Sequence, residues 1–374
     1  MNSIKVKIMK QKLTKTFFLV IVSLTFVWSV NAQTNEKELM DAIASIKKSF
    51  ESYRHKTDAL QKKIDDIYWY NKVGDVAYVD KVYMTGPPLA KEKNPTAQGA
   101  GNPVKFWSYI FFPKNLNPSG KYPLLVFPHG GVHSNMNTYY THIIRELVSQ
   151  GYIIVAAEYR GSTGYGQGHY KKIDYGGLEI QDVDASRQYM IDNYDVVDEN
   201  RVGILGWSHG GLITLHNIFD SPKNYKVAFA GVPVSDLIAR MGYKTQGYRN
   251  LYSADYHIGK TAYANVEEYR RRSPAWQAHK YSGTPLLIHT NTIDADVNVL
   301  EVEHLIKSLK ATGKKNFKYT IFKDIPGGHS FDRMDHKKAK EIRLKIYKHL
   351  NDYLKPNKPF KNLRDLQKAG YRYN

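Results

Sequence analysis

From residue 106 to residue 354 the chain alternates short apolar runs with longer amphipathic runs, which limits its possible folds more than any other feature. The apolar runs have the length of strands and lie at 106–112, 124–127, 153–157, 202–205, 227–232, 286–289 and 319–322. Runs with helical spacing lie near 139–149, 180–193, 211–219, 299–311 and 337–354. Buried strands that alternate with helices specify a mostly parallel, doubly wound sheet covered on both faces. The predicted fold class is therefore α/β, with a tyrosine-rich excursion at 236–282 that we interpret as a small lid.

Composition and missing motifs exclude several classes of protein. The 374 residues include no cysteine, which excludes disulfide scaffolds, thiolate metal sites and cysteine nucleophiles. There is no apolar run of about 20 residues, as a multispanning membrane protein needs. No repeat of a length typical of propeller blades is present. A Walker loop, a Rossmann glycine pattern and a His-Glu-x-x-His pair are also missing, which disfavours the classes of protein that depend on these motifs.

The first 32 residues have the pattern of a secretory signal peptide. Five lysines and no acidic residue precede the apolar stretch 17–30, and Val30-Asn31-Ala32 follows with small residues at the positions that a signal peptidase reads. A permanent N-terminal anchor is the alternative, but the stretch is short for a span of about 20 residues. We therefore expect cleavage after Ala32, export to the periplasm or the cell exterior, and no stable membrane insertion afterwards.

The chain is strongly basic. Its formal charge of +19 becomes +14 once the five lysines of the predicted signal peptide are removed. An excess of this size favours anionic partners. Because no nucleic-acid-binding motif is present and an exported protein rarely meets nucleic acid, we expect no nucleic-acid partner and interpret the charge as a solvated basic surface. The oligomeric state is left open.

Residues 33–100 are expected to form a short N-terminal helical arm and a linker. A helix over residues 33 to about 70 is predicted from apolar residues at helical spacing, namely Leu39, Ile43, Ile46, Phe50, Leu60 and Ile64. This helix either docks on the main body or pairs with another copy. A strand is predicted at 76–84, and a loop rich in Pro, Gly and Lys at 86–103 is taken as the boundary of the main domain. The main domain then covers 101–355, and a basic tail covers 356–374.

Gly206-Trp207-Ser208-His209-Gly210 stands between a predicted strand and a predicted helix. A Gly-x-Ser-x-Gly in this context is a nucleophile elbow, in which small neighbours let the chain pass around a strained serine. Ser208 would then project at the helix N-terminus, where the helix dipole favours a developing anion. The alternative is a glycine-rich turn without chemistry, which the strand and helix on either side disfavour.

A serine nucleophile needs a base, and the base in turn needs an acid. In elbow-bearing sheets the acid and then the histidine follow the serine along the chain. His329 lies in a glycine-rich loop after the last predicted strand and is the candidate general base. Asp294 and Asp296 both follow the preceding strand; either would fix the tautomer of the imidazole and stabilise the imidazolium. We favour Asp294.

The developing oxyanion needs backbone N–H groups aimed at it. One is expected from His209, the residue after the nucleophile. A second is expected from the turn His129-Gly130-Gly131 at the end of an early strand, where glycines let the backbone approach a substrate closely. The candidate oxyanion hole therefore consists of His209, Gly130 and His129. An ordinary turn is the alternative interpretation of the His-Gly-Gly sequence.

Five motifs together resemble the catalytic domain of the prolyl oligopeptidase family, with its dipeptidyl-peptidase and acylaminoacyl-peptidase branches. They are His129-Gly130-Gly131, Tyr159-Arg160-Gly161-Ser162-Thr163-Gly164-Tyr165-Gly166, Gly206-Trp207-Ser208-His209-Gly210-Gly211, Ser273-Pro274 and Gly328-His329-Ser330-Phe331. The resemblance implies an α/β-hydrolase fold over roughly 105–354, no cofactor, and the triad Ser208, Asp294 and His329. It departs from the family in an extra residue before Asp294, in His129 where a tyrosine is frequent, and in the missing N-terminal propeller.

The resemblance also implies a function: an exported serine hydrolase that cleaves peptide bonds through an acyl-enzyme on Ser208. A carboxylesterase or acyl esterase with the same triad is the alternative, and a binding protein on an inactive hydrolase fold is a further one. The expected partner is a peptide or acyl-ester substrate. Arg160, within the second motif, either holds a substrate group or joins loops through a buried partner such as Asp182. We favour the structural role.

Overall fold

The computed structural model describes residues 36–92 and 94–371, so the predicted signal peptide lies outside the described residues. The chain divides into a unit that ends at Arg54 and a unit that begins at His55. The division falls inside the long helix α2 (Glu36–Val73), which accounts for all that is described of the first unit. Among the described residues, no helix has both the length and the apolarity needed to cross a membrane.

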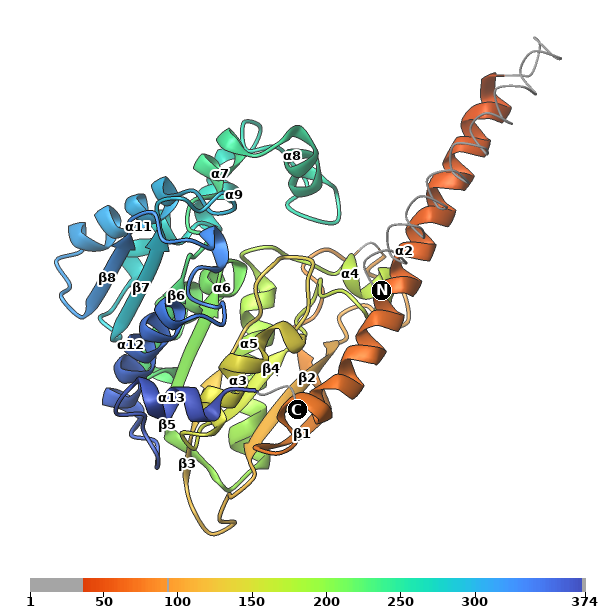
Figure 1. Cartoon of the computed structure of the whole chain (residues 1–374). Helices are drawn as coiled ribbons and strands as arrows, with labels where there is room; N and C mark the ends of the chain where they lie inside the picture. The colour runs from red at the N-terminus through yellow and green to blue at the C-terminus, as the bar shows by residue number, and fades with distance from the viewer. Residues whose placement is uncertain (1–35, 93, 372–374) are drawn as a thin grey trace, which may run out of the picture. The chain divides into compact units, whose positions relative to one another are not determined.

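The second unit is built on one eight-stranded sheet in the order β1-β2-β4-β3-β5-β6-β7-β8 (Figure 1). Its strands are β1 (Ala77–Gly86), β2 (Val104–Pro113), β3 (Tyr122–Val126), β4 (Ile153–Ala157), β5 (Val197–Trp207), β6 (Val227–Gly231), β7 (Leu286–Asn291) and β8 (Phe317–Phe322). β2 runs antiparallel to β1 and β4, and the strands from β3 to β8 are all parallel. This confirms the predicted α/β-hydrolase fold.

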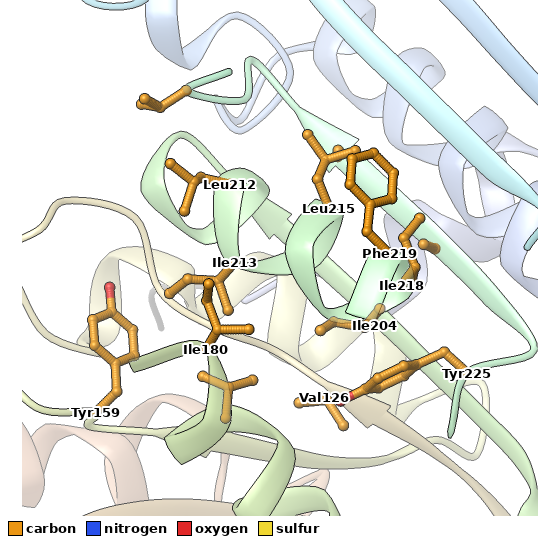
Figure 2. Close-up of a cluster of buried hydrophobic side chains, with 14 of the residues drawn as sticks. Val126, Tyr159, Ile180, Ile204, Leu212, Ile213, Leu215, Ile218, Phe219 and Tyr225 are labelled. Carbon is orange, nitrogen blue, oxygen red and sulfur yellow. The ribbon is translucent and has the colours of Figure 1, made fainter. Parts of the chain in front are cut away.

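Helices cover both faces of the sheet. They are α3 (Thr141–Val148), α4 (Gly166–Tyr170), α5 (Leu178–Asn193), α6 (His209–Asp220), α11 (Val299–Ala311), α12 (Lys337–Leu354) and α13 (Leu363–Ala369). Side chains of α5, α6 and α11 pack in one apolar cluster, part of which Figure 2 shows, whereas α3, α12 and α13 contribute to a second. Along β4, Val155 belongs to the first cluster and Ile154 to the second, because successive strand residues point to opposite faces.

The predicted lid is a run of short helices between β6 and β7. These are α7 (Leu237–Tyr243), α8 (Gln246–Ser253), α9 (Val266–Arg271) and α10 (Pro274–Gln277). Asp236 caps α7 by accepting hydrogen bonds from the N–H groups of Ile238 and Ala239. α7 contacts residues 296–298 after β7 and so lies at the carboxyl edge of the parallel strands, where an open α/β sheet places its ligand site. The later helices lead back to the amino end of β7, which runs parallel to β6.

The boundaries of the main body differ from those expected at both ends. β1 pairs with β2 along its whole length, and Trp69 and Val73 of α2 are fully buried, so the body begins within α2 and not in the loop at 86–103. α2 itself spans Glu36–Val73 and agrees within a few residues with the helix predicted over 33 to about 70. The expected basic tail contains α13, which buries Leu366 and Ala369, because two apolar side chains among the basic ones face the core.

Candidate active site

Ser208 lies in the sharp turn between β5 and α6. β5 ends at Trp207 and α6 begins at His209. The backbone of Ser208 has φ 60° and ψ −121°, a strained conformation for a residue with a side chain. Its N–H donates to the carbonyl of Gly231 at 2.9 Å, and its own carbonyl accepts from the N–H of Leu212 at 3.1 Å. The serine is thus fixed at the carboxyl edge of the sheet, beside the N-terminus of α6.

Close backbone contacts require the glycines on both sides of Ser208. A Cβ at Gly206 would lie 2.3 Å from the carbonyl oxygen of Gly210, and a Cβ at Gly210 would lie 2.2 Å from the carbonyl oxygen of Pro128. Neither position has room for any side chain. The close contact between Gly210 and Pro128 also places the turn after β3 directly against the elbow. The second glycine of the motif is therefore needed both for the elbow itself and for the packing of the turn that contains Gly130.

His329 contacts the acid that we favoured from the sequence. Its Nδ1 lies 2.7 Å from Oδ2 of Asp294, which follows β7 and has a fully buried side chain. The other oxygen of Asp294 accepts hydrogen bonds from the N–H groups of Asp296, at 2.8 Å, and Val297, at 2.9 Å. The carboxylate is therefore held by its own loop and can orient the imidazole. The residue inserted before Asp294 leaves this contact intact.

Asp296 occupies a different position. About half of its side chain is exposed, and Oδ1 accepts from Nζ of Lys244 at 2.7 Å and lies 3.6 Å from Arg240. Its Oδ2 lies 3.7 Å from Nε2 of His329. Partial burial acts to raise the pKa of Asp296, but the hydrogen bond from Lys244 and the nearby basic groups outweigh it, so the pKa is below its ordinary value. Two carboxylates thus flank the imidazole, one at each nitrogen.

The loop that carries His329 is fastened to the elbow. Nε1 of Trp207, the neighbour of Ser208, donates to Oδ2 of Asp332 at 2.8 Å, and the side chain of Arg333 donates to the carbonyl of His329. No hydrogen bond joins Ser208 itself to His329 within the part of the chain that the structure describes. Contacts of this kind often form only when substrate is bound.

Gly130 lies against the serine. A Cβ added to it would come within 3.4 Å of Cβ of Ser208. Its N–H donates to Oη of Tyr140 at 3.2 Å. The N–H of His209 belongs to the first turn of α6, where helical N–H groups have no acceptor within the helix. Gly130 and His209, the two backbone donors predicted from the sequence, therefore both lie next to Ser208.

The ring of His129 is not available to a substrate. It is fully buried, with Nε2 2.8 Å from Oγ of Ser162 and Nδ1 3.1 Å from Oη of Tyr159. Burial lowers its pKa to about 3, so the ring is neutral. The predicted oxyanion hole uses the backbone of this turn, so the burial of the ring leaves that prediction unchanged. The side chain of His129 instead fastens the turn to Tyr159 and Ser162 in the loop after β4.

The surroundings of the His209 ring could not be predicted from the sequence. Its ring stacks on Tyr175 with centroids 4.4 Å apart, and Nε2 lies 3.5 Å from Oε1 of Glu179. Glu179 is fully buried, and burial, together with the charge of Asp174, raises its pKa to about 8. The pKa of His209 lies well below its ordinary value, because burial disfavours the imidazolium. The residue next to the nucleophile therefore has a neutral ring, which is stacked on a second aromatic ring, that of Tyr175.

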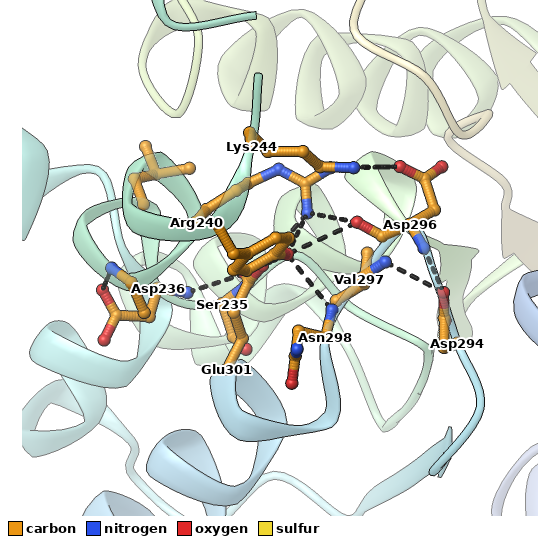
Figure 3. A network of polar contacts seen from close by, with 12 residues as sticks. Ser235, Asp236, Arg240, Lys244, Asp294, Asp296, Val297, Asn298 and Glu301 are labelled. Atoms are coloured by element: carbon orange, nitrogen blue, oxygen red, sulfur yellow. Dashed lines mark hydrogen bonds and ion pairs between the residues drawn. The ribbon is translucent and has the colours of Figure 1, made fainter. Parts of the chain in front are cut away.

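A buried acid anchors the lid to the loop of the triad acid (Figure 3). Glu301 accepts from the N–H groups of Ser235 and Asp236, from Nη1 of Arg240 at 3.0 Å and from the hydroxyl of Tyr243. The same Nη1 donates to the carbonyl of Asp296 at 3.0 Å. Helix α7 and residues 294–298 are thus joined through one carboxylate. Helical spacing placed Glu301 on a helix but could not reveal this role.

Arg160 has the structural role that we favoured. Its Nε and Nη2 donate to the two oxygens of Asp182 at 2.7 and 2.8 Å, and both side chains are fully buried. The guanidinium also donates to the carbonyls of Pro87 and Pro88. It joins the loop after β4 to α5 and to the segment after β1. Within residues 36–92 and 94–371, no group of three or more His, Asp or Glu side chains is arranged to hold a metal ion.

Comparison with known proteins identifies relatives among peptidases. Residues 138–357, well over half of the chain, match the prolyl oligopeptidase family; the turn at His129 lies before the match. The chain is 31% identical over 219 residues to mouse dipeptidyl peptidase 8, an alignment that covers 56% of this chain and 23% of that protein. It is 26% identical over 295 residues to acylamino-acid-releasing enzyme 1 of Oryza sativa subsp. japonica, covering 75% and 36%. The alignments thus span about a quarter to a third of these relatives' length.

Solved structures share the fold. The acylaminoacyl peptidase of Pyrococcus horikoshii superposes with a TM-score of 0.59 and 20% identity, over 80% of this chain and 45% of that one. Dipeptidyl peptidase 4 of Porphyromonas gingivalis superposes with a TM-score of 0.58 and 22% identity, over 75% and 36%. At such identities the likeness establishes the fold alone.

Proposed function

Since the chain belongs to the prolyl oligopeptidase family, we propose that it is a serine peptidase with Ser208 as nucleophile, His329 as general base and Asp294 as the acid that orients it. The observation that carries this assignment is the 2.7 Å contact between the buried Asp294 and Nδ1 of His329, in a loop fastened to the strained turn of Ser208. His304 makes a similar contact with the buried Asp236, but it lies on α11 and not in the loop that is fastened to the elbow.

The proposed reaction has two halves. Oγ of Ser208 attacks the carbonyl carbon of the substrate while its proton passes to Nε2 of His329, and Asp294 stabilises the imidazolium through Nδ1–H. The oxyanion takes hydrogen bonds from the N–H groups of His209 and Gly130, near the positive end of α6. His329 then protonates the leaving amine, and water releases the acyl group from the serine by the same steps.

Peptides are the substrates that we propose. The relatives that the chain resembles are named as a dipeptidyl peptidase and an acylamino-acid-releasing enzyme, both of which act on peptide-like substrates by name. The proposed substrate class is peptides, with no particular residue assigned to either side of the cleaved bond. Export remains part of the proposal, supported by the five lysines, the apolar stretch 17–30 and Ala32 at its end.

A fluorophosphonate probe tests the nucleophile. We expect the wild-type protein to be labelled on Ser208 and the Ser208→Ala variant to remain unlabelled, with mass spectrometry to locate the adduct. The same preparations are then assayed with aminoacyl and dipeptidyl anilides beside p-nitrophenyl acyl esters. Amide cleavage that Ser208→Ala abolishes supports a peptidase. Rapid ester turnover without any amide cleavage would identify an esterase, and an unlabelled wild-type protein would point to an inactive binding protein.

Export is tested on the protein recovered from outside the cytoplasm of an expressing bacterium. We expect its N-terminal residue to be Gln33, because the signal peptidase cleaves after Ala32. A variant with Ala32→Arg should be cleaved poorly, since a long charged side chain does not fit where the peptidase reads small ones. Recovery of the uncleaved chain in the cytoplasm alone would contradict this part of the proposal.

A further inference from the structure

Lys62 of α2 is almost completely buried, although its neighbours along the chain are exposed. Its side chain is 2% exposed, and Nζ lies 3.0 Å from Oε1 of Glu158, whose side chain is fully buried at the end of β4. Nζ also donates to the carbonyl of Met136. A buried charge of this kind is strongly destabilising unless it is paired. The helix therefore enters the body at this point through a specific polar contact.

Glu158 continues the contact toward the oxyanion hole. Its Oε2 lies 3.6 Å from Nε2 of His129, the residue before Gly130, and its Oε1 accepts from the N–H of Met136 at 3.2 Å. The next residue, Tyr159, donates from Oη to the carbonyl of His129 at 2.9 Å. The carboxylate of Glu158 thus lies between Lys62 and His129, the residue that precedes Gly130.

Asp65, one helical turn after Lys62, makes a second contact with the segment 129–140, which follows β3. It accepts from the N–H of Thr138 at 3.1 Å and from its Oγ1 at 2.6 Å. Thr138 opens the short 3-10 turn that ends at Tyr140, the residue whose hydroxyl accepts the Gly130 N–H. α2 therefore binds the segment 129–140 through two side chains, Lys62 and Asp65. Each of them is connected to Gly130 by one or two further residues.

We propose that Lys62 and Asp65 are positioning residues of the oxyanion hole, so that α2 sets the position of Gly130 beside Ser208. The inference rests on the proposed function, because it assigns Gly130 to the oxyanion. The close fit of the helix supports it: a Cβ at Gly164 would lie 2.7 Å from Cβ of Lys62, so the loop after Arg160 packs directly on the same turn of α2. Burial raises the pKa of Glu158, while Lys62 acts against that rise.

Lys62→Met tests the proposal, because methionine keeps most of the length of the side chain and removes the charge. Displacing one oxyanion donor should lower kcat by about 10- to 100-fold, with KM changed by less than about threefold. Rates are expressed per active site, counted by titration with the fluorophosphonate, so that loss of folded protein does not mimic loss of rate. Lys63→Met is the matched control, since Lys63 is exposed on the same helix, and it should leave kcat unchanged.

The double variant Lys62→Met/Glu158→Gln separates positioning by Lys62 from the effect of an unpaired buried charge. An amide at position 158 still accepts from the N–H of Met136 and leaves no unpaired buried charge beside His129. Because the contacts of Lys62 are still missing, we expect its kcat per active site to stay within about threefold of that of Lys62→Met. Recovery to the wild-type kcat would mean that Lys62 only neutralises Glu158, and would overturn the inference.

Hydrogen–deuterium exchange supplies a readout that does not depend on activity. Peptides that cover residues 129–140 should exchange faster in Lys62→Met than in wild type, and at the wild-type rate in Lys63→Met. Unchanged exchange and unchanged kcat in Lys62→Met would overturn the inference. If the probe fails to label wild type, the proposed function fails, whereas the exchange comparison still decides whether Lys62 holds this segment.

Discussion

Asp294→Asn is expected to lower kcat by about 10⁴-fold, the loss produced by this change in a well-studied triad. The reason is that asparagine keeps the size of the side chain and still accepts the N–H groups of Asp296 and Val297, but it offers Nδ1 of His329 the wrong partner. The thermal midpoint should therefore remain close to that of wild type. Steady-state rates on titrated sites and a thermal unfolding curve measure both quantities.

Asp296→Asn is the matched control for that change. Its carboxylate is about half exposed and faces Lys244 on one side and Nε2 of His329 on the other. Because it does not touch Nδ1, its loss should alter kcat by less than about tenfold. If Asp296→Asn proved inactive while Asp294→Asn retained its rate, the acid of the site would be Asp296, although Ser208 and His329 would keep their roles.

Arg343→Met is expected to reduce the free energy of unfolding by about 3–5 kcal/mol, the usual result of breaking a buried ion pair from one side. Arg343 of α12 is fully buried and donates from Nε and Nη2 to the two oxygens of Glu146 of α3, at 2.7 and 2.8 Å. It also donates to the carbonyls of Asp332 and Met334, in the loop that follows His329. The substitution leaves Glu146 charged and buried, with only the hydroxyl of Tyr347 still bound to it.

Urea unfolding measures this loss, with Lys345→Met as the control because Lys345 is exposed on the same helix. The control should change stability by less than about 0.5 kcal/mol. Should Arg343→Met unfold at the wild-type urea concentration, the buried pair would contribute no net stability. A double variant that also carries Glu146→Gln should recover part of the loss, since it removes the unpaired charge.

Short apolar runs predicted the sheet well because the central strands β3, β4, β6 and β7 are buried on both faces. Strand β4 and helices α11 and α12 have the predicted bounds, and most other strands differ from prediction by a few residues at an end. The elbow was predictable for the same kind of reason, since the clashes at Gly206 and Gly210 leave glycine as the only residue that fits. Where a backbone geometry allows only glycine, the glycines in the sequence indicate that geometry directly.

The packing face of α2 could not be predicted from its apolar residues. Leu60 and Ile64, part of the predicted apolar stripe, are 60% and 46% exposed, whereas Lys62 and Trp69 are buried. A lysine on a charged helix looks like a solvated residue until its partner is known. That partner, Glu158, lies almost a hundred residues away at the end of β4, so only the folded chain brings the pair together.

The hydroxyl of Tyr140 has a consequence for the energetics of turnover. It is a neutral acceptor, because burial raises its pKa, and it accepts from the Gly130 N–H, which the proposed function assigns to the oxyanion. A substrate that enters therefore exchanges one neutral acceptor for another, and the ground state gains little. As negative charge develops on the substrate oxygen, the same N–H forms a stronger, charge-assisted bond. Because the Gly130 N–H already has a partner in the empty site, its bond to a neutral substrate oxygen adds little binding free energy. Under the proposed function, this N–H would therefore stabilise the transition state more than the bound substrate.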